Sequence, residues 1–271
     1  MLLCFRLVRV GNSTLLVFHV WSVDKFSNDN IVGRVHIFDM DKHAKHRLAP
    51  SMTLARAEIN WIPLDVKGEA YFTYSLDPLR VMKCDKESGD CQFIYEQPGT
   101  KDSPFVYTSD HLRGGTPWAL YKYPYYISIA HNVLVSKNPR INYSMYNANI
   151  VVLCVDPWSV VYVSRNLEFD PDWLRSKAII RNHTISEPFF YPTGLIMWDE
   201  DTLDVSGHLN DASGHILRMR GFKQLMQEVM SQAHSPSSAP VRTVQQYVVE
   251  ATKRAWPGTT FFGDIIEGTV E

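Results

Sequence analysis

PFFYPTGLIMWDEDTLDVSGHLND, residues 188–211, contains two apolar runs separated by an acidic turn at 198–201. The runs 190–197 and 202–207 have the length and composition of short strands, which predicts a β-hairpin. The second run leads into a polar end made of Gly207, His208, Leu209, Asn210 and Asp211. Carboxylates and amides held on rigid strands are suited to hydrogen-bonding sugar hydroxyls. The segment therefore predicts a polar pocket at the end of a β-sheet.

The same hairpin pattern recurs earlier in the chain, at 7–21, 61–75 and 118–131. Each copy is an apolar strand, a short polar turn and an aromatic-rich strand that ends in polar residues. Further strands are expected at 31–38, 80–84, 91–95, 148–155 and 215–219. The copies are spaced by roughly 50–70 residues, which suits the four-stranded blades of a β-propeller. Because no helices alternate with the strands, a doubly wound α/β fold is disfavoured, whereas a β-sandwich remains an alternative.

Composition and charge exclude several classes of partner. The 271 residues are 45% hydrophobic and 21% charged, which is typical of a globular protein with a full core. A formal net charge of −2 gives no electrostatic reason to expect nucleic acid as a partner. No apolar segment is long enough to span a membrane. The chain opens almost directly in a strand pattern, so we expect the N-terminal part of a larger fold to be missing.

Helical signals are confined to the C-terminal part of the chain. Apolar residues at helical spacing predict a helix over 222–230, and a second amphipathic helix is predicted over 244–256. The stretch 234–240 between them has the composition of a linker. We therefore expect a β domain over 1–222 and a helical tail over 223–271.

The cysteines and glycosylation sequons leave the cellular compartment open. Cys84 and Cys91 flank a polar turn, so they form either a disulfide or two free thiols. The spacing of the four cysteines fits no common zinc site. Sequons occur at Asn12, Asn142 and Asn182. A disulfide and used sequons would favour the secretory pathway, and free thiols the cytoplasm.

Four motifs follow one another along the chain: PYYISIAH (124–131), VDPWSVVYVSR (155–165), YPTG (191–194) and GHLND (207–211). In this order they resemble motifs of the β-mannoside phosphorylases and hydrolases of glycoside hydrolase family 130, and of the related eukaryotic β-1,2-mannosyltransferases. The resemblance covers roughly residues 5–222 and implies an all-β, five-bladed propeller that is incomplete at its N-terminal side. It further implies a mannose-containing oligosaccharide or GDP-mannose as substrate, with no cofactor or metal ion.

The resemblance also suggests roles for residues at the strand ends. Asp24 maps to the general acid of the family, which would act in an inverting reaction without a covalent intermediate. The candidate substrate-binding residues are Asn60, Trp61, Asp77, Arg113, His131 and Asp211. Asn60 would supply an amide, Trp61 a stacking face, and Arg113 a cationic clamp. His131 matches a strand-end histidine of the family.

Several of these residues also have a purely structural interpretation. Asp24 would then only solvate the polar loop 24–30, and Trp61 would belong to the core. His131 would bond to the backbone, and Arg113 would cap a loop. Asp211 would form an Asx-turn.

Two departures from the family pattern bear on the reaction. Near Cys4 the family carries an E-D-P-R motif, of which only Arg6 is present. The arginines that bind phosphate in the phosphorylases are also absent, because Ile59 precedes Asn60 and the segment 74–77 has no arginine. A phosphate dianion needs paired cationic or backbone donors, so transfer to a sugar or hydrolysis is favoured over phosphorolysis.

Two other functions compete with this interpretation. Asp39-Met40-Asp41 follows an apolar strand, and paired carboxylates of this kind bind a divalent metal and a diphosphate in nucleotide-sugar transferases of another fold. The missing acidic half of the E-D-P-R motif favours instead a degenerate propeller that serves as a carbohydrate-binding or interaction module.

Overall fold

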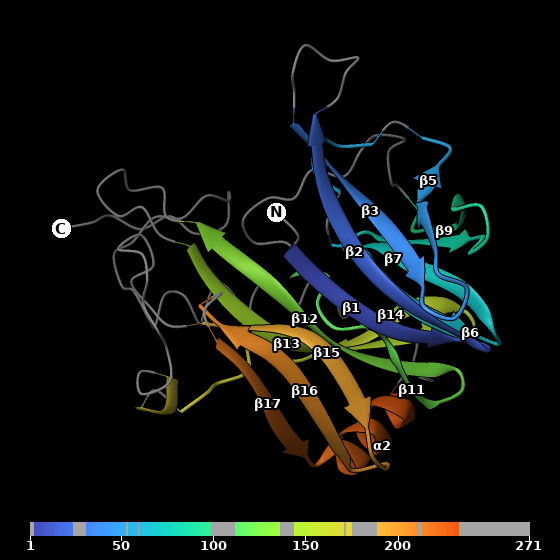
Figure 1. Cartoon of the computed structure of the whole chain (residues 1–271). Helices are drawn as coiled ribbons and strands as arrows, with labels where there is room; N and C mark the ends of the chain where they lie inside the picture. Colours follow the sequence, from blue (N-terminus) through green and yellow to red (C-terminus); the bar gives the residue numbers. More distant parts are fainter. Residues whose placement is uncertain are drawn as a thin grey trace. The chain divides into compact units, whose positions relative to one another are not determined.

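A computed structural model of the chain describes residues 3–23, 31–52, 54–58, 60–98, 112–135, 144–170, 172–174, 189–210 and 213–232. Strands predominate, and they form four sheets that succeed one another along the chain as the blades of a propeller do (Figure 1). The all-β prediction, the propeller arrangement and the C-terminal helix are thereby confirmed; the expected fifth blade is not among the described residues.

The described residues divide into two compact units. Unit 1 holds the residues up to 98 together with 116–118, and unit 2 holds 112–115 and the residues from 119 onward. The predicted boundary between a β domain and a helical tail at 222/223 stays a prediction. No helix in the described ranges combines the length and the apolarity needed to cross a membrane.

The first sheet of unit 1 is an antiparallel meander of β1 (Leu3–Val10), β2 (Ser13–Val23), β3 (Ile31–Asp39) and β4 (Ala44–Arg47). Buried residues alternate with more exposed ones, because successive side chains of a strand point to opposite faces. The turn between β1 and β2 uses Gly11 at a φ of 56°, a conformation that glycine adopts without steric cost. One face of this sheet is therefore available to pack against the next sheet.

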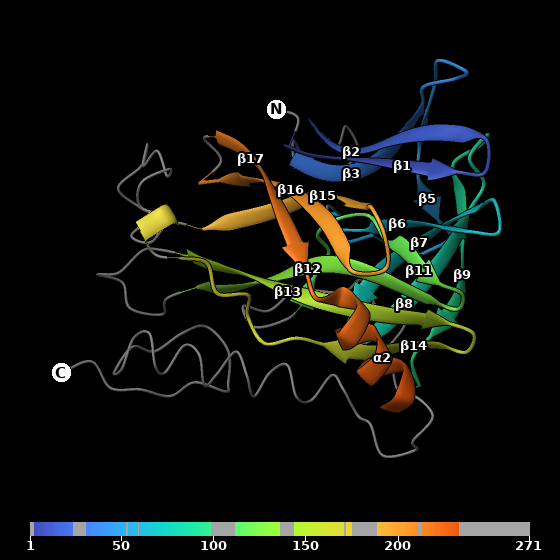
Figure 2. The same cartoon turned by 90° about the horizontal axis from the view of Figure 1, so that it is seen from below.

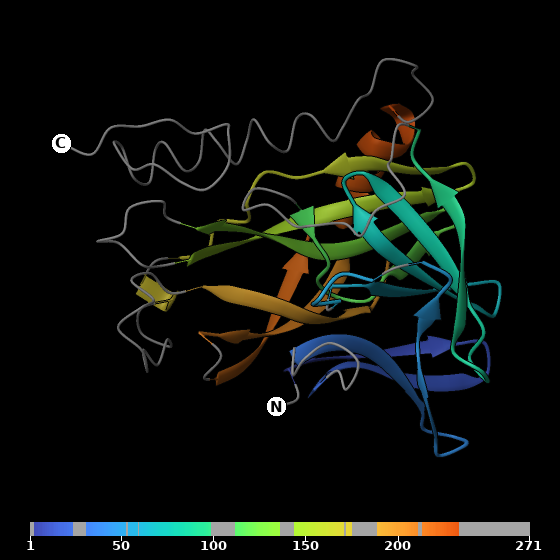
Figure 3. The same ribbon diagram turned by 90° about the horizontal axis from the view of Figure 1, so that it is seen from above.

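The second sheet of unit 1 has the order β5-β9-β8-β7-β6. Its strands are β5 (Ala49–Pro50), β6 (Ile62–Val66), β7 (Glu69–Leu76), β8 (Leu79–Cys84) and β9 (Asp90–Glu96), the last four antiparallel to one another. Figure 3 shows these strands in blue to teal. Strands β6 and β7 correspond to the hairpin predicted over 61–75, and β8 and β9 to the two strands predicted after it; the short strand β5 was not predicted.

The core of unit 1 lies between its two sheets. Val17 and Ile37 from the first sheet pack with Phe72 and Met82 from the second, and each is at most 1% exposed. Full burial of such a side chain contributes about 1.5–3 kcal/mol to folding. Cys84 and Cys91 stand opposite each other on β8 and β9, are buried in this core, and are joined by a disulfide. Of the two thiol states left open by the sequence, the structure contains the disulfide.

The first sheet of unit 2 is built around two long paired strands. Its strands are β10 (Leu112–Arg113), β11 (Ala119–Lys122), β12 (Tyr125–Val135), β13 (Ser144–Val155) and β14 (Trp158–Val163), all antiparallel. Strand β12 extends four residues past His131, where the sequence predicted its end. The reason is that β13 continues to pair with β12 as far as Val135.

The second sheet of unit 2 contains the hairpin that opened the sequence argument. It comprises β15 (Phe190–Met197), β16 (Thr202–Leu209) and β17 (Ser213–Arg220), followed by α2 (Phe222–Gln232). Asp199 accepts hydrogen bonds from the N–H groups of residues 201 and 202, both at 2.7 Å, which explains the acidic turn. The predicted hairpin is confirmed.

The core of unit 2 joins both of its sheets to the helix (Figure 2). Ile129 and Val152 from β12 and β13 belong to it together with Val205 from β16. From α2, Phe222 and Met226 point into the same core, which explains the helical spacing of these apolar residues. The first part of the C-terminal tail is therefore a packed element of unit 2.

Candidate functional site

Arg113 and His131 are brought together in unit 2 by strand register. They stand directly opposite each other in the antiparallel pair β10–β12, so their side chains lie on the same face of the sheet. Gly115 follows closely, and a Cβ atom at this position would clash with the carbonyl oxygen of Ile129. Gly115 therefore allows the backbone after Arg113 to lie close against β12.

Aromatic rings surround the His131 imidazole, which is 2% exposed. The Tyr191 ring lies 4.6 Å from it between centroids, and the Tyr146 ring lies 6.1 Å away. Tyr191 in turn stacks on His208, with centroids 4.9 Å apart and ring planes inclined by 9°. Two histidines, two tyrosines and Arg113 therefore form one group, which we call the unit 2 cluster. Aromatic rings of this kind can stack on a pyranose, and the guanidinium and imidazole nitrogens can form hydrogen bonds with its hydroxyls.

Three members of the unit 2 cluster were not among the residues predicted for the site: Tyr146, Tyr191 and His208. For Tyr191 and His208 the signal was present, because a hairpin centred on the acidic turn pairs these two residues directly. Tyr146 comes from the start of β13, on the same face as His131. No motif marks it, so only the tertiary structure identifies it.

Asn210 closes the same end of the β15–β16 hairpin. Its Oδ1 accepts a hydrogen bond from the Phe189 N–H at 2.9 Å, and its own N–H donates to the Phe189 carbonyl oxygen at 3.2 Å. The buried Nδ2 has no hydrogen-bond partner within the described ranges, which leaves a donor at this strand end. Asp211, the predicted sugar ligand next to it, lies outside the described residues, as does the predicted acid Asp24.

A second polar group, the unit 1 network, is centred on Glu58. Its carboxylate accepts hydrogen bonds from Trp61 Nε1 and the Tyr74 hydroxyl, each at 3.0 Å, and from the Ala55 N–H at 2.7 Å. Trp61 is only 1% exposed, as its core interpretation expects, while the neighbouring Asn60 is 5% exposed. Glu58 was not among the residues predicted for the site. Its signal in the sequence is a charged residue placed just before the apolar start of a strand.

Asp77 lies at the same end of the second sheet as this network. It is half-buried and sits in the turn that joins β7 to β8, while Ile62, the first residue of β6, pairs with Thr73 of β7.

A buried arginine follows on β8: Arg80 lies over the rings of Tyr74 and Phe93, at 5.0 and 4.4 Å. Its Nε donates to Glu96 Oε2 at 2.7 Å. The guanidinium is thus engaged by a carboxylate and by aromatic faces.

Arg6 and His19 are buried polar residues on the core-facing side of the first sheet, each 3% exposed. Burial, and secondarily the positive charge of Arg6, lowers the pKa of His19 from 6.5 to about 4. Its Nδ1 has no hydrogen-bond partner among the residues that the structure describes. His19 is therefore a neutral imidazole near neutral pH, beside the one arginine that survives from the E-D-P-R motif.

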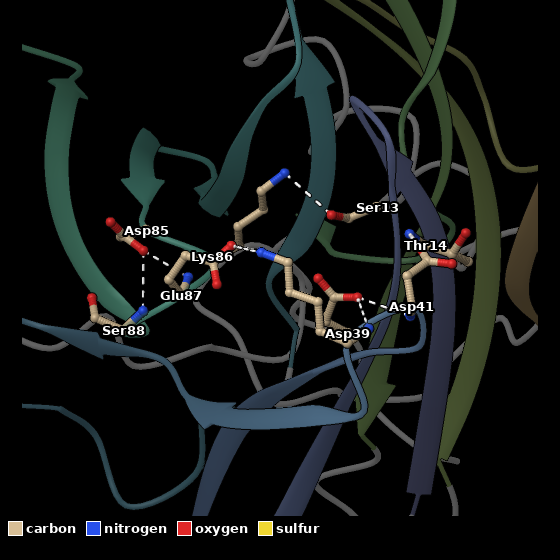
Figure 4. Close-up of polar contacts among 9 residues, drawn as sticks. Ser13, Thr14, Asp39, Asp41, Asp85, Lys86, Glu87 and Ser88 are labelled. Atoms are coloured by element: carbon tan, nitrogen blue, oxygen red, sulfur yellow. Dashed lines mark hydrogen bonds and ion pairs between the residues drawn. The ribbon is translucent and has the colours of Figure 1, made fainter.

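Asp39 and Asp41, the alternative metal motif, bind backbone amides in turns (Figure 4). Asp39 Oδ1 accepts from the N–H groups of Asp41 and Lys42, at 2.9 and 3.0 Å. Asp41 Oδ2 accepts from the Thr14 N–H at 2.8 Å. No group of three metal-ligating side chains occurs in the described ranges. Both carboxylates are thus engaged by backbone N–H groups and stabilise the turn after β3. This use argues against their forming a site for a divalent metal ion and a diphosphate.

Comparison with known proteins supports the resemblance noted in the sequence. No protein-family model matches the chain. The chain is 30% identical over 112 residues to β-mannosyltransferase 2 of Komagataella phaffii, a match that covers 40% of this chain and 16% of that protein. It is 37% identical over 82 residues to β-mannosyltransferase 1 of the same organism, covering 27% of this chain and 12% of that protein. The matched stretches thus span less than a fifth of these relatives.

Solved structures are similar in fold. A glycosyl hydrolase from Bacteroides ovatus superposes with a TM-score of 0.52 and 12% identity, covering 80% of this chain and 64% of that chain. A chain from Parabacteroides distasonis gives the same TM-score and identity, over 79% of this chain and 66% of that chain. At this identity the likeness concerns the fold alone. The chain is therefore a β-propeller that is distantly similar in sequence to the β-mannosyltransferases of Komagataella phaffii.

Proposed function

We propose that this chain acts on β-linked mannosides, by mannosyl transfer or by hydrolysis with inversion. The observation that carries the proposal is the sequence similarity over 112 residues to β-mannosyltransferase 2. The described strand ends agree with it, since they carry aromatic rings, imidazoles and a guanidinium that are compatible with a sugar.

The unit 2 cluster supplies the groups for binding the sugar. Arg113 offers several N–H donors in a fixed plane, and the imidazole of His131 offers a further hydrogen-bonding nitrogen. Tyr191 and His208 provide a stacked pair of rings beside them. In this proposal Asp211 is a further ligand of sugar hydroxyls, and the amide of Asn60 and the carboxylate of Asp77 are the candidate ligands of unit 1. Trp61, which was predicted to stack on the sugar, is buried in the core of unit 1 and therefore supports Asn60 instead of contacting the sugar.

Asp24 is the proposed general acid. In hydrolysis with inversion it protonates the departing oxygen, directly or through a sugar hydroxyl, while water attacks the anomeric carbon from the opposite face. The attacking water gives up a proton to the solvent, and the solvent restores the proton on Asp24. In transfer from GDP-mannose the diphosphate departs as an anion, and Asp24 instead takes the proton of the attacking hydroxyl. Neither route forms a covalent enzyme intermediate. Phosphorolysis is disfavoured because the buried Arg80 is already paired with Glu96.

Turnover of defined substrates tests the proposal. The purified chain is incubated with GDP-mannose and a mannose oligosaccharide, and separately with a β-linked mannobiose, and products are identified by mass spectrometry and NMR. We expect Asp24→Asn to lower turnover by at least about a hundredfold, the usual contribution of a general acid, while mannoside binding persists. Asp172→Asn, an exposed carboxylate of unit 2, is the matched control and should leave turnover unchanged. Equal turnover by Asp24→Asn and the wild type would refute the role of Asp24.

The second candidate is a carbohydrate-binding module without activity. It is favoured by the absence of the acidic residues that precede Arg6 in the family motif. Calorimetry with the same mannobiose separates the two functions. Measurable binding without any product from either substrate would support the module, and product formation would exclude it.

A further inference from the structure

Glu58 is a buried carboxylate that the proposed reaction does not use. It is 4% exposed, and both of its oxygens are occupied: Oε1 by Ala55 and Tyr74, and Oε2 by Trp61. These three donors come from the segment that precedes β6 and from β7. One side chain therefore connects the segment before β6 to the strand β7.

The backbone around Glu58 is tied down as well. The Glu58 N–H donates to the carbonyl oxygen of Gly33 at 3.1 Å, and the Gly33 N–H donates to that of Arg56 at 2.8 Å. Segment 55–58 is thereby attached to the edge of β3, next to a parallel bridge between Gly33 and residue 57. Asn60 directly precedes Trp61 in the chain and is 5% exposed. The bonds that fix Trp61 and segment 55–58 therefore restrict where the backbone of Asn60 can lie.

We propose that Glu58 is the positioning residue of the mannoside site, because its carboxylate fixes Trp61 and Tyr74 and thereby sets the position of the Asn60 amide. This rests on the proposed function. Groups that orient a binding side chain commonly affect binding without touching the ligand, since a site that is held loosely loses its geometry.

Ionisation of Glu58 should control this arrangement. Burial is the largest influence on the carboxyl and raises its pKa, while hydrogen bonds from Ala55, Trp61 and Tyr74 and the charge of Arg34 on β3 oppose that rise. Protonation weakens these three hydrogen bonds, because a carboxylate accepts more strongly than a neutral carboxyl group does. Positioning is therefore present above the pKa of Glu58 and is lost as the pH falls through it.

The test combines substrate kinetics with an NMR signal, using Glu58→Gln, Glu58→Ala and the control Glu69→Gln. Glu69 is an exposed glutamate at the start of β7, so its replacement should have no effect. The KM for the mannoside should rise on the order of tenfold in Glu58→Gln, with little change in kcat, since Asn60 binds ground and transition states alike. Glu58→Gln keeps the size of the side chain and guards against the failure of Glu58→Ala to fold.

The pH dependence supplies a readout that a merely structural role would not change. In the wild type, the indole N–H resonance of Trp61, assigned with Trp61→Phe, should shift in one titration, and KM should rise over the same pH range. Both effects should vanish in Glu58→Gln. An unchanged KM in Glu58→Gln, or a titrating Trp61 signal with a constant KM, overturns the proposal. If the wild type neither binds nor converts mannosides, the proposed function fails and this proposal fails with it.

Discussion

Two buried histidines have different environments. The His131 imidazole sits among the rings of Tyr146 and Tyr191, opposite Arg113, in a group suited to a ligand. His19 lies on the core side of the first sheet near Arg6, where burial suppresses its charged form. The two histidines are buried to the same extent, but their neighbours differ. His131 is therefore a candidate ligand, whereas His19 is a structural residue whose pKa changes on folding.

His19 should make the stability of the protein sensitive to mild acid. The unfolded chain binds a proton at His19 below about pH 6.5, whereas the folded chain does so only below about pH 4. Stability should therefore fall between pH 6.5 and pH 4, by a few kcal/mol in total, since one pKa unit corresponds to about 1.4 kcal/mol. Urea unfolding across this range should show a shallower loss for His19→Gln than for the wild type. Identical slopes would contradict the lowered pKa.

At the scale of elements, local patterns predicted the hairpin β15–β16 and the helix α2 well. Alternating and helical spacing of apolar residues reflects which face of an element is buried, so it survives in the sequence. The extent of β12 was predicted poorly, because its last four residues depend on pairing with the following strand β13 and not on their own apolar pattern. The Cys84–Cys91 bond was also undecided until β8 and β9 were paired in register.

The helix α2 should contribute strongly to the stability of unit 2. Met226 is 0% exposed and packs in the core with residues of β13 and β16. Met226→Ala should destabilise the protein by about 2–5 kcal/mol, because it removes buried contacts and leaves a cavity. Gln227→Ala, at the adjacent exposed position, should change stability by less than about 0.5 kcal/mol. Denaturant unfolding monitored by circular dichroism compares the two, and equal effects would argue against the packing of α2.

At the scale of the whole molecule, the chain has four sheets among its described residues and two groups of candidate ligands, one in each unit. The family resemblance assigns mannoside binding to a residue of each group, Asn60 in unit 1 and His131 in unit 2. The most informative experiment on the molecule as a whole therefore combines a substitution in each group and measures mannoside binding.

A double-mutant cycle addresses this prediction. Mannoside dissociation constants are measured by calorimetry for the wild type, Asn60→Ala, His131→Ala and the double variant. If both residues hold one sugar, their effects should be coupled by about 0.5 kcal/mol or more. The same cycle with Glu69→Ala in place of Asn60→Ala is the control and should be additive. Additivity of Asn60 and His131 would mean that they serve separate sites or none.

The sequence by itself determined the all-β fold, the repeated hairpins and the order of motifs that resembles the mannoside-active propellers. It could do so because strand alternation, turn residues and motif order are local properties of the chain. Only the tertiary structure decided the Cys84–Cys91 disulfide, the grouping of Tyr146, Tyr191 and His208 around His131, and the burial of Glu58 against Trp61 and Tyr74. These features depend on the register in which strands pair and on which side chains the packed sheets bury, and the apolar pattern of a single strand encodes neither.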